Sequence, residues 1–333
     1  MSLDFTAIDF ETANGFRGSP CAVGLSRVRG GRIVEEAFWL MRPPAGHDHF
    51  DPRNIEIHGV TPQQVASQPR FGEVFGEITD FLGADVLVAH NAAFDTGVIK
   101  AALQASARPG PAFAYACTVI LARRSYSLPS YSLPFVAEAA GVPLIHHHDA
   151  IEDARACAGI MIDIAGIHGA ESIEQLYQAM SLSLPVMEAF QPDLAQLDSQ
   201  LDSARLDSAR TAPLVQNSSW LGWPEEGANP EPNISADRNH PLYGQTVVFT
   251  GNLQIPRSTA KVRAAEVGAR PASSVTAKTT VLVVGDGFIA ADLRRGDTSA
   301  GRVTTKARRV LELHGKGQQI EVLSEGEFMQ MIG

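Results

Sequence analysis

The 333-residue sequence predicts an α/β protein with two folded units, a larger one over residues 1–183 and a smaller one over residues 241–333. Short apolar runs of β type alternate with segments of helical periodicity in both units. Between the units, residues 184–240 are rich in Pro, Ser, Asn, Asp and Gln, a composition typical of a flexible linker. A hydrophobic content of 44% and a charged content of 19% exclude a membrane-embedded or fully disordered chain.

The first unit combines strand and helix patterns. Closely spaced apolar and β-branched residues predict strands over residues 5–8, 21–28, 33–39 and 86–89. Apolar residues at intervals of three and four predict helices over residues 71–82, 96–103, 150–164 and 171–180. The mixture of the two patterns predicts an α/β unit.

The expected linker is acidic and contains a short repeat. Leu-Asp-Ser recurs at Leu197, Leu201 and Leu206, a spacing that also suits a short solvated helix, so both interpretations stay open. Trp220 and Trp223 are unusual in such a polar segment. We expect them to hold it against a folded unit rather than to bind a separate partner.

Regular structure is expected again from residue 242. The patterns predict strands over residues 246–250, 280–284 and 320–323, helices over residues 258–267 and 304–314, and a last helix that ends at Ile332. Gly315 stands where a helix C-terminal glycine belongs, and Ser324 with Glu327 matches a capping box. A second, small α/β unit fits this span.

The net charge of −10 is distributed unevenly. Residues 1–165 contain 18 acidic and 12 basic side chains, residues 166–240 contain 11 and 3, and residues 241–333 contain 8 and 12. The net charges of the three pieces are therefore −6, −8 and +4. The basic C-terminal unit suits a partner that carries phosphate groups.

Cysteine usage and the N-terminal sequence indicate the compartment. Cys21, Cys117 and Cys157 are odd in number and far apart, which predicts reduced thiols rather than a disulfide framework or a structural zinc site. No apolar run reaches the roughly 18 residues of a membrane helix, and the first 13 residues carry acids but no bases, unlike a secretory signal. We expect a cytoplasmic protein without a membrane partner. Arginine outnumbers lysine 22 to 5, which suggests a GC-rich bacterial genome.

Carboxylates mark three positions in the first unit. Asp9 and Glu11 lie two positions apart at the end of the first strand, so their side chains point to the same face. Asp95 stands where a later strand gives way to a helix, and His148 and Asp153 flank the start of another helix. Taken singly, these residues have structural explanations: solvated acids on an edge strand, a helix N-cap and a polar loop. Carboxylates that are held together repel unless a cation lies between them.

Taken together, the residues resemble the DEDD-type 3′→5′ exonucleases of the DnaQ-like group, in the variant that contains histidine. The family's D-x-E motif matches Asp9 and Glu11, its H-N-x-x-F-D motif ends at Asp95, and its H-x-A-x-x-D motif runs from His148 to Asp153. Two further stretches resemble the family, Ile57 to Thr61 and Leu128 to Leu133. The resemblance covers residues 4–175 and implies an RNase H-like exonuclease fold, in which helices flank a mixed sheet.

The resemblance also implies a site for two Mg²⁺ or Mn²⁺ ions. Two such ions can supply a nucleophilic water and neutralise the phosphate during phosphodiester hydrolysis, and hard oxygen ligands select them. Asp9 would bridge both ions, Glu11 and Asp153 would complete the site of the attacking water, and Asp95 would serve the other ion. His148 would act as the general base, because a neutral imidazole can accept the proton of the water.

His146 and His147 are expected to be bystanders. A zinc site built from three consecutive histidines is the alternative, although adjacent side chains do not easily converge on one ion. Removal of a terminal nucleotide needs a frayed 3′ end, on which Phe10 or Phe94 could stack unless they belong to the core.

The start of the C-terminal unit, Leu242 to Gly251, resembles a BRCT domain, closest to those of NAD-dependent DNA ligases and large clamp-loader subunits. Some of these domains bind a DNA 5′-phosphate through a Thr-Gly pair, an arginine and a lysine at a helix start. The corresponding residues here are Thr250, Gly251, Arg257 and Lys306. Relatives often carry a further lysine where this chain has Val303, so phosphate binding and docking onto a protein both stay open.

The motifs together predict a 3′→5′ exonuclease that acts on single-stranded or frayed DNA 3′ ends in repair or replication proofreading, close to the bacterial nucleoid. A DNA polymerase or a sliding clamp is the expected class of protein partner, and Ser181 to Pro185 partly resembles a clamp-binding peptide. The alternatives are a ribonuclease that trims RNA 3′ ends and an inactive scaffold that docks through the BRCT domain. The complete set of four carboxylates and a histidine argues against the scaffold.

Overall fold

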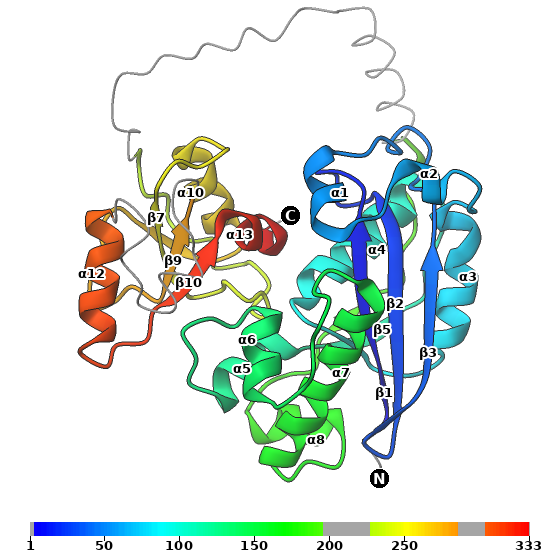
Figure 1. Ribbon diagram of the computed structural model, residues 1–333, viewed down its shortest axis with the longest axis horizontal. Coiled ribbons are helices and arrows are strands. Elements are labelled where there is room, and N and C mark those ends of the chain that lie inside the picture. The colour runs from blue at the N-terminus through cyan, green and yellow to red at the C-terminus, as the bar shows by residue number, and fades with distance from the viewer. Residues whose placement is uncertain (1–2, 196–226, 286–303, 333) are drawn as a thin grey trace, which may run out of the picture.

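The computed structural model describes residues 3–195, 227–285 and 304–332, which form two α/β units (Figure 1). Several residues named above lie outside these ranges, and the predictions about them remain predictions. They are Leu197, Leu201, Leu206, Trp220, Trp223 and Val303.

The larger unit is built on a six-stranded mixed sheet with the strand order β3-β2-β1-β4-β5-β6. Its first three strands form an antiparallel meander of β1 (Phe5–Thr12), β2 (Pro20–Arg29) and β3 (Arg32–Leu40). A two-residue turn joins β2 to β3, in which Gly30 and Gly31 have φ angles of 57° and 72°. Two successive positive φ angles give a type I′ turn, whose twist matches that of the strands. The meander therefore has a fixed register.

The remaining strands extend the sheet on the other side of β1. β4 (Leu87–Ala89) and β5 (Phe113–Cys117) run parallel to β1, and β6 (Val186–Met187) runs antiparallel to β5. The strand predicted at 86–89 is confirmed, whereas β5 and β6 were not predicted. β6 falls in the segment that composition assigned to the linker, because two residues at a sheet edge leave no periodic signal.

Helices cover both faces of this sheet. α7 (Ala150–Ile167) crosses β1 and β2 on one face. α3 (Phe71–Leu82) and α4 (Ala92–Ala105) pack together on the opposite face, where the ring of Phe71 meets that of Phe10. The shorter helices are α1 (Pro52–His58), α2 (Pro62–Val65), α5 (Thr118–Ser125), α6 (Leu133–Ala139) and α8 (Ile173–Ala179). The predicted mixed sheet with flanking helices is confirmed.

The smaller unit has a four-stranded parallel sheet in the order β10-β9-β7-β8. Its strands are β7 (Thr246–Thr250), β8 (Arg270–Ala272), β9 (Val281–Val284) and β10 (Glu321–Ser324). Its helices are α10 (Arg257–Glu266), α12 (Thr305–His314) and α13 (Glu325–Ile332). All were predicted except β8, a three-residue edge strand that contains Pro271 and therefore carries little strand signal.

The structure confirms the predicted cap before α13, whereas the glycine after α12 is not left-handed as a C-terminal glycine cap usually is. The capping box before α13 is confirmed: the backbone N–H of Glu327 donates to Ser324 Oγ at 3.1 Å, and that of Ser324 donates to Glu327 Oε2 at 2.6 Å. Gly315 does follow α12, but its φ of −62° is right-handed. The left-handed turn occurs two residues later, at Gly317, where φ is 82°.

The two units are in contact, and the contact places α13 beside the larger unit (Figure 1). Arg123 of α5 forms a 2.5 Å ion pair with Glu321 of β10, and both side chains are largely buried. Arg17 and Asn91 donate to the carbonyl oxygen of Gln330 on α13, at 3.3 and 3.5 Å. The C-terminal helix is therefore held next to α4.

The residues just before the smaller unit are part of it. The backbone N–H of Asn233 donates to the carbonyl of Ala265 at 2.8 Å, and Lys261 Nζ donates to Asn229 Oδ1 at 2.8 Å. Lys261 is fully buried, so the amide oxygen of Asn229 supplies an acceptor that its ammonium group needs. Within the three described ranges, no helix is both long and apolar enough to cross a bilayer.

Candidate active site

Four carboxylates from three elements meet at one end of the larger sheet. Asp9 and Glu11 come from β1, Asp95 from the first turn of α4, and Asp153 from the first turn of α7. Oxygen atoms of Asp9, Glu11 and Asp153 all lie within 4.8 Å of one another. Three of the four side chains are buried, and that of Asp9 is half-buried. The structure therefore brings the predicted acidic residues together.

A close approach of α7 to β2 sets the distance between Asp9 and Asp153. Asp9 is paired across the sheet with Gly24 of β2. A Cβ atom at Gly24 would lie 2.3 Å from the carbonyl oxygen of Ala150 and 2.5 Å from the Cα of Ile151. Both atoms belong to the backbone of α7, so only glycine allows the helix to lie this close. A glycine within a strand pattern is the sequence signal for such a contact, although Gly24 was not among the residues predicted to shape the site.

Asp95 is anchored on the backbone of β1. Its Oδ1 accepts the N–H of Phe10 at 3.1 Å, which places it between Asp9 and Glu11 along the strand. α4 begins at Ala92, four residues earlier than predicted, and Asn91 precedes it with a left-handed φ of 71°. Asp95 is therefore not the helix N-cap. The helix could begin early because asparagine tolerates the left-handed conformation.

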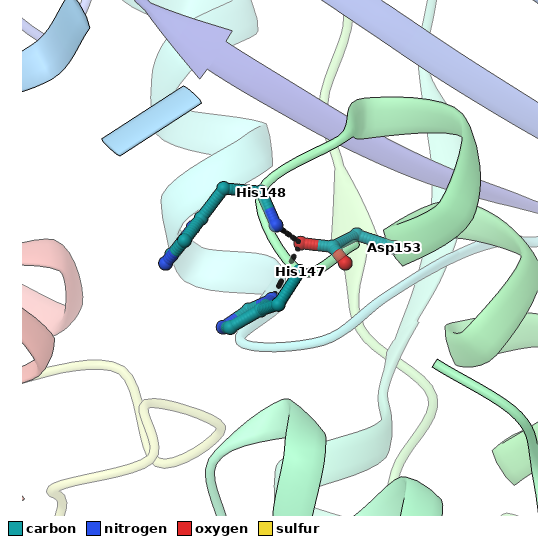
Figure 2. A group of neighbouring side chains, drawn as sticks. All are labelled: His147, His148 and Asp153. Atoms are coloured by element: carbon teal, nitrogen blue, oxygen red, sulfur yellow. Dashed lines mark hydrogen bonds and ion pairs between the residues drawn. The ribbon is translucent and has the colours of Figure 1, made fainter. Parts of the chain in front are cut away.

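Asp153 is surrounded by the preceding histidine loop, as Figure 2 shows. Its Oδ2 accepts the backbone N–H of His148 at 3.0 Å and lies 2.9 Å from His147 Nδ1. Its Oδ1 is buried and has no hydrogen-bond partner. His148 has a φ of 75°, a conformation that costs free energy for a residue with a side chain and is typical of functional sites.

The three consecutive histidines do not converge. His146 turns to Glu152, with its Nδ1 3.1 Å from Glu152 Oε1, and its side chain is exposed. His147 and His148 stack instead, with ring centroids 3.8 Å apart. Asp149 caps α7 by accepting the backbone N–H groups of Ile151 and Glu152, a role that the sequence analysis had not assigned.

The pKa values of three carboxylates, Asp9, Glu11 and Asp95, are raised. Burial, followed by repulsion from Asp153, raises the pKa of Asp9 and that of Glu11 well above the ordinary range. Burial likewise raises the pKa of Asp95, although the hydrogen bond from Phe10 lowers it. Without a cation, this cluster retains protons that ordinary carboxylates release.

The cluster has the chemical properties of a divalent-cation site. Its donors are hard carboxylate oxygens, the ligands that Mg²⁺ and Mn²⁺ prefer. Asp153 Oδ1 is buried without a partner, and such an atom normally requires a hydrogen bond or an ion. A bound cation would also lower the raised pKa values of Asp9 and Glu11. The residues present therefore fit a metal site.

Burial, followed by repulsion from His147, lowers the pKa of His148 to about 4. The imidazole is therefore neutral at physiological pH, as a proton acceptor must be.

His90, in contrast, is structural: its Nδ1 lies 2.8 Å from Thr118 Oγ1 and its Nε2 2.9 Å from the carbonyl of Tyr131.

The two aromatic residues considered for base stacking, Phe10 and Phe94, differ in exposure. Phe10 is 2% exposed and belongs to the core, so it does not line a binding surface. Phe94 is partly exposed, and the guanidinium of Arg17 lies 5.5 Å from its ring centre. Arg17 also donates to the carbonyl of Ala93 at 3.2 Å. Arg17 was not singled out from the sequence, since a single arginine in a loop carries no motif.

The four residues proposed to bind phosphate in the smaller unit lie near the end of β7. Thr250 Oγ1 is 2.6 Å from Thr304 Oγ1 at the start of α12. Arg257 Nη2 donates to the carbonyl of Gly251 at 2.8 Å, and Lys306 Nζ donates to that of Phe249 at 3.0 Å. Both cationic side chains thus contact backbone carbonyls at one edge of the sheet.

Comparisons with known proteins relate the larger unit to exonucleases. A family model described as Exonuclease matches residues 6–161. The chain is 31% identical over 167 residues to exodeoxyribonuclease 10 of Escherichia coli K12, a match that covers 49% of this chain and 69% of that protein. It is 30% identical over 160 residues to a PolC-type DNA polymerase III of Thermotoga maritima, covering 47% of this chain and 12% of the polymerase.

A third match is 30% identical over 186 residues, to a putative bifunctional exonuclease/endonuclease protein of Mycobacterium tuberculosis, and covers 28% of that protein. The chain thus spans only about an eighth to about a quarter of the length of several relatives that it matches. Among solved structures, exonuclease X in complex with 5′ overhanging duplex DNA is 28% identical, with a TM-score of 0.43 over 53% of this chain and 98% of that chain.

Proposed function

The chain belongs to the exonuclease family, and on that premise we propose that it removes nucleotides from DNA 3′ ends by metal-dependent hydrolysis. Its larger unit has the RNase H-like fold of that family. The observation that carries the proposal is the convergence of Asp9, Glu11 and Asp153, whose oxygens lie within 4.8 Å of one another. These three side chains come from two elements, β1 and α7, which lie far apart in the chain and are brought together only by the fold.

Two divalent ions, Mg²⁺ or Mn²⁺, would be held by these carboxylates. Asp9 would contact both ions, Glu11 and Asp153 would complete one site, and Asp95 would serve the other. When bound, such ions neutralise charge on the phosphate and lower the pKa of a bound water. The protein holds the ligands in advance: Phe10 fixes Asp95 through its backbone, and Gly24 lets α7 bring Asp153 close to Asp9.

His148 is the proposed general base. Its imidazole is neutral because burial lowers its pKa, so it can accept the proton of an attacking water without first losing one. Its backbone N–H is fixed on Asp153 Oδ2 at 3.0 Å. The base and one carboxylate of the cluster are therefore held in a constant relation, which oriented proton transfer requires.

DNA is the proposed substrate, because exodeoxyribonuclease 10, a relative matched over 69% of its length, bears the name of a DNA exonuclease. Partly exposed Phe94 lies in the first turn of α4, one residue before Asp95, and could stack on a frayed terminal base. The 3′→5′ direction follows from the resemblance of the three motifs and is part of the proposal.

The test is digestion of 5′-labelled single-stranded DNA and RNA of one sequence, resolved on a gel, with Mg²⁺, Mn²⁺ or EDTA. We expect a metal-dependent ladder on DNA that shortens from the 3′ end and is absent with Asp9→Ala. Asp80→Asn, which changes an exposed carboxylate on α3, is the matched control and should digest normally. Digestion of RNA alone would favour the ribonuclease. Full digestion by Asp9→Ala would overturn the assignment of the site.

The smaller unit is proposed to be a BRCT domain that recruits the nuclease to DNA ends or to a replication protein, such as a polymerase or a sliding clamp. The support is the parallel four-stranded sheet and the grouping of Thr250, Arg257 and Lys306 at one edge. A Lys306→Gln variant should lose affinity for a 5′-phosphorylated DNA end if the edge binds phosphate. It should retain that affinity if the unit docks onto protein.

A further inference from the structure

We propose that His147, His148 and Asp153 form a second cation site, suited to Zn²⁺, that overlaps the catalytic site and inhibits it when occupied. The inhibition rests on the proposed nuclease function, whereas the binding of the ion does not. His147 has no part in the catalytic arrangement described above. The site therefore gives this histidine a function that the acidic motifs do not explain.

The first argument is geometric. One ring nitrogen of each histidine and one oxygen of Asp153 lie within 4.8 Å of one another. Adjacent side chains normally diverge, but the left-handed φ of 75° at His148 turns the chain so that the two rings stack at 3.8 Å and an angle of 22°. Figure 2 shows both rings on the same side of the loop, with Asp153 next to them. The left-handed residue thus places both imidazoles beside Asp153, where rotation of the rings about their side-chain bonds would bring one nitrogen of each onto a shared ion.

The second argument concerns the distances that an ion requires. Ligand atoms around a tetrahedral zinc ion are about 3.3 Å apart, given bonds of about 2.0–2.1 Å. His147 Nδ1 and Asp153 Oδ2 are 2.9 Å apart, so a small outward movement suffices. If Nδ1 is the binding atom, the ring proton moves to Nε2 and the imidazole stays neutral. The exposed edge of His147 leaves an entry path and a fourth position for water.

The third argument is ligand chemistry. Two imidazole nitrogens and one carboxylate are typical of sites for Zn²⁺ and similar transition metals, whereas Mg²⁺ prefers oxygen ligands. The neighbouring group of Asp9, Glu11 and Asp153 offers oxygen alone. Asp153 belongs to both groups, so the two sites differ in preference and share one ligand.

Occupation of the nitrogen-containing site would stop hydrolysis for two reasons. The lone pair of His148 would be bound to the ion, so the imidazole could not accept a proton. Asp153, whose Oδ2 already lies next to both histidines, would be bound to this ion and less available to the group with Asp9 and Glu11. We therefore expect Zn²⁺ to inhibit in the presence of Mg²⁺, since only Asp153 is shared and the two imidazole ligands favour Zn²⁺ over Mg²⁺.

The experiment compares the full-length wild type with His147→Gln and His146→Gln. His146 is the matched control, because it is the adjacent histidine but faces Glu152. Zn²⁺ binding is measured by calorimetry in buffer that contains saturating Mg²⁺, and Co²⁺ is used in parallel to detect a tetrahedral site by its visible absorption. Mg²⁺-dependent nuclease activity is measured in the same three proteins after treatment with chelator.

We expect wild type and His146→Gln to bind one Zn²⁺, with Co²⁺ bands of a tetrahedral site. His147→Gln should bind Zn²⁺ at least about tenfold more weakly, since even outer partners of metal ligands contribute that much. Its inhibition by Zn²⁺, expressed relative to its own Mg²⁺-dependent activity without Zn²⁺, should be reduced in parallel.

Equal Zn²⁺ affinity in His147→Gln and wild type would overturn the proposal. So would Zn²⁺ binding that Asp9→Asn, measured alongside, weakens and His147→Gln does not, because the ion would then occupy the carboxylate cluster. Tight, His147-dependent Zn²⁺ binding by a protein without nuclease activity would support the site and contradict only the proposed function. The two proposals can therefore fail separately.

Discussion

At the scale of single residues, the buried carboxylates that would bind a cation lower the free energy of unfolding when no cation is bound. Burial and mutual repulsion raise the pKa values of Asp9 and Glu11, so the folded protein retains protons that the unfolded chain releases near pH 4. The free energy of unfolding therefore decreases as the pH rises above that range, and it should recover when a cation binds.

Asp9→Asn tests this destabilisation directly. Removing one charge should lower hydrolysis on the order of 10²–10³-fold or more, because a ligand is lost. In EDTA at pH 7.5, the same change should raise the free energy of unfolding by about 1 kcal/mol, which is a rise of about 2–4 °C in melting temperature. Thermal unfolding with and without Mn²⁺ measures both effects, and Mn²⁺ should stabilise wild type more than the variant. A variant that is less stable in EDTA would contradict the repulsion argument.

The buried imidazole of His90 should make the free energy of unfolding decrease as the pH falls below about 6.5. Burial lowers its pKa to about 3, so the folded protein disfavours a proton that the unfolded chain accepts near pH 6.5. Its contribution is complete above pH 6.5 and is lost as the pH falls from there toward 3. The destabilisation caused by His90→Gln should therefore be about 2 kcal/mol smaller at pH 5 than at pH 7.5. Denaturant unfolding at both values measures it, with His49→Gln, at an exposed histidine, as the control. An effect independent of pH would refute a neutral buried His90.

At the scale of secondary-structure elements, the spacing between α7 and the sheet controls the site. Gly24 lies across from Asp9 and directly beneath the backbone of α7. The atoms nearest to a Cβ at Gly24 belong to the backbone of α7, so no flexible side chain could move aside to make room for it. The position of Asp153 therefore depends on the absence of a methyl group on the neighbouring strand.

Gly24→Ala should push α7 outward and separate Asp153 from Asp9. Overpacking of this kind costs about 1–3 kcal/mol of stability, and a displacement of about 1 Å of a reacting group lowers rates about 10²-fold. Gly76→Ala on α3 is the matched control, since a Cβ there meets no atom within 4 Å. Nuclease rates and melting temperatures of both variants measure the effect. Normal activity in Gly24→Ala would show that α7 can shift without disturbing the cluster.

The elements also show what sequence reasoning could reach. The strands and helices that carry Asp9, Asp95 and Asp153 have strong periodic patterns and were predicted. Strands β5, β6 and β8 were missed because each is short and is stabilised by its place at a sheet, not by its own composition. The stacking of His147 on His148 was also missed, since it depends on one left-handed φ angle that no local pattern specifies.

At the scale of the whole molecule, an ion pair joins the two units. Arg123 and Glu321 are both largely buried, and the backbone N–H of Tyr131 donates to Glu321 at 3.3 Å. Removal of one partner from such a pair leaves a buried charge, which costs several kcal/mol. The attachment of α13 beside α4 therefore depends in part on this ion pair.

Arg123→Ala should release the smaller unit without unfolding either one. A compact chain of 333 residues has a radius of gyration of about 20 Å, and detachment should increase it by several ångströms. Small-angle scattering of the full-length protein measures this change. Arg124→Ala, at the exposed neighbouring position, should leave the radius unchanged. Equal radii for all three proteins would show that the remaining contacts suffice.

The order of the catalytic residues along the chain also determines when the site can form. β1 carries Asp9 in the middle of the sheet, yet Asp95 bonds to a residue 85 positions away, and Asp153 arrives only with α7. Contacts of such sequence separation form late in folding, because large loops must close first. If the chain is the nuclease proposed above, a nascent chain should have no metal-dependent activity until α7 has left the ribosome. The proposed activity would thus require β1, α4 and α7 to be folded together, and no one of these elements would suffice.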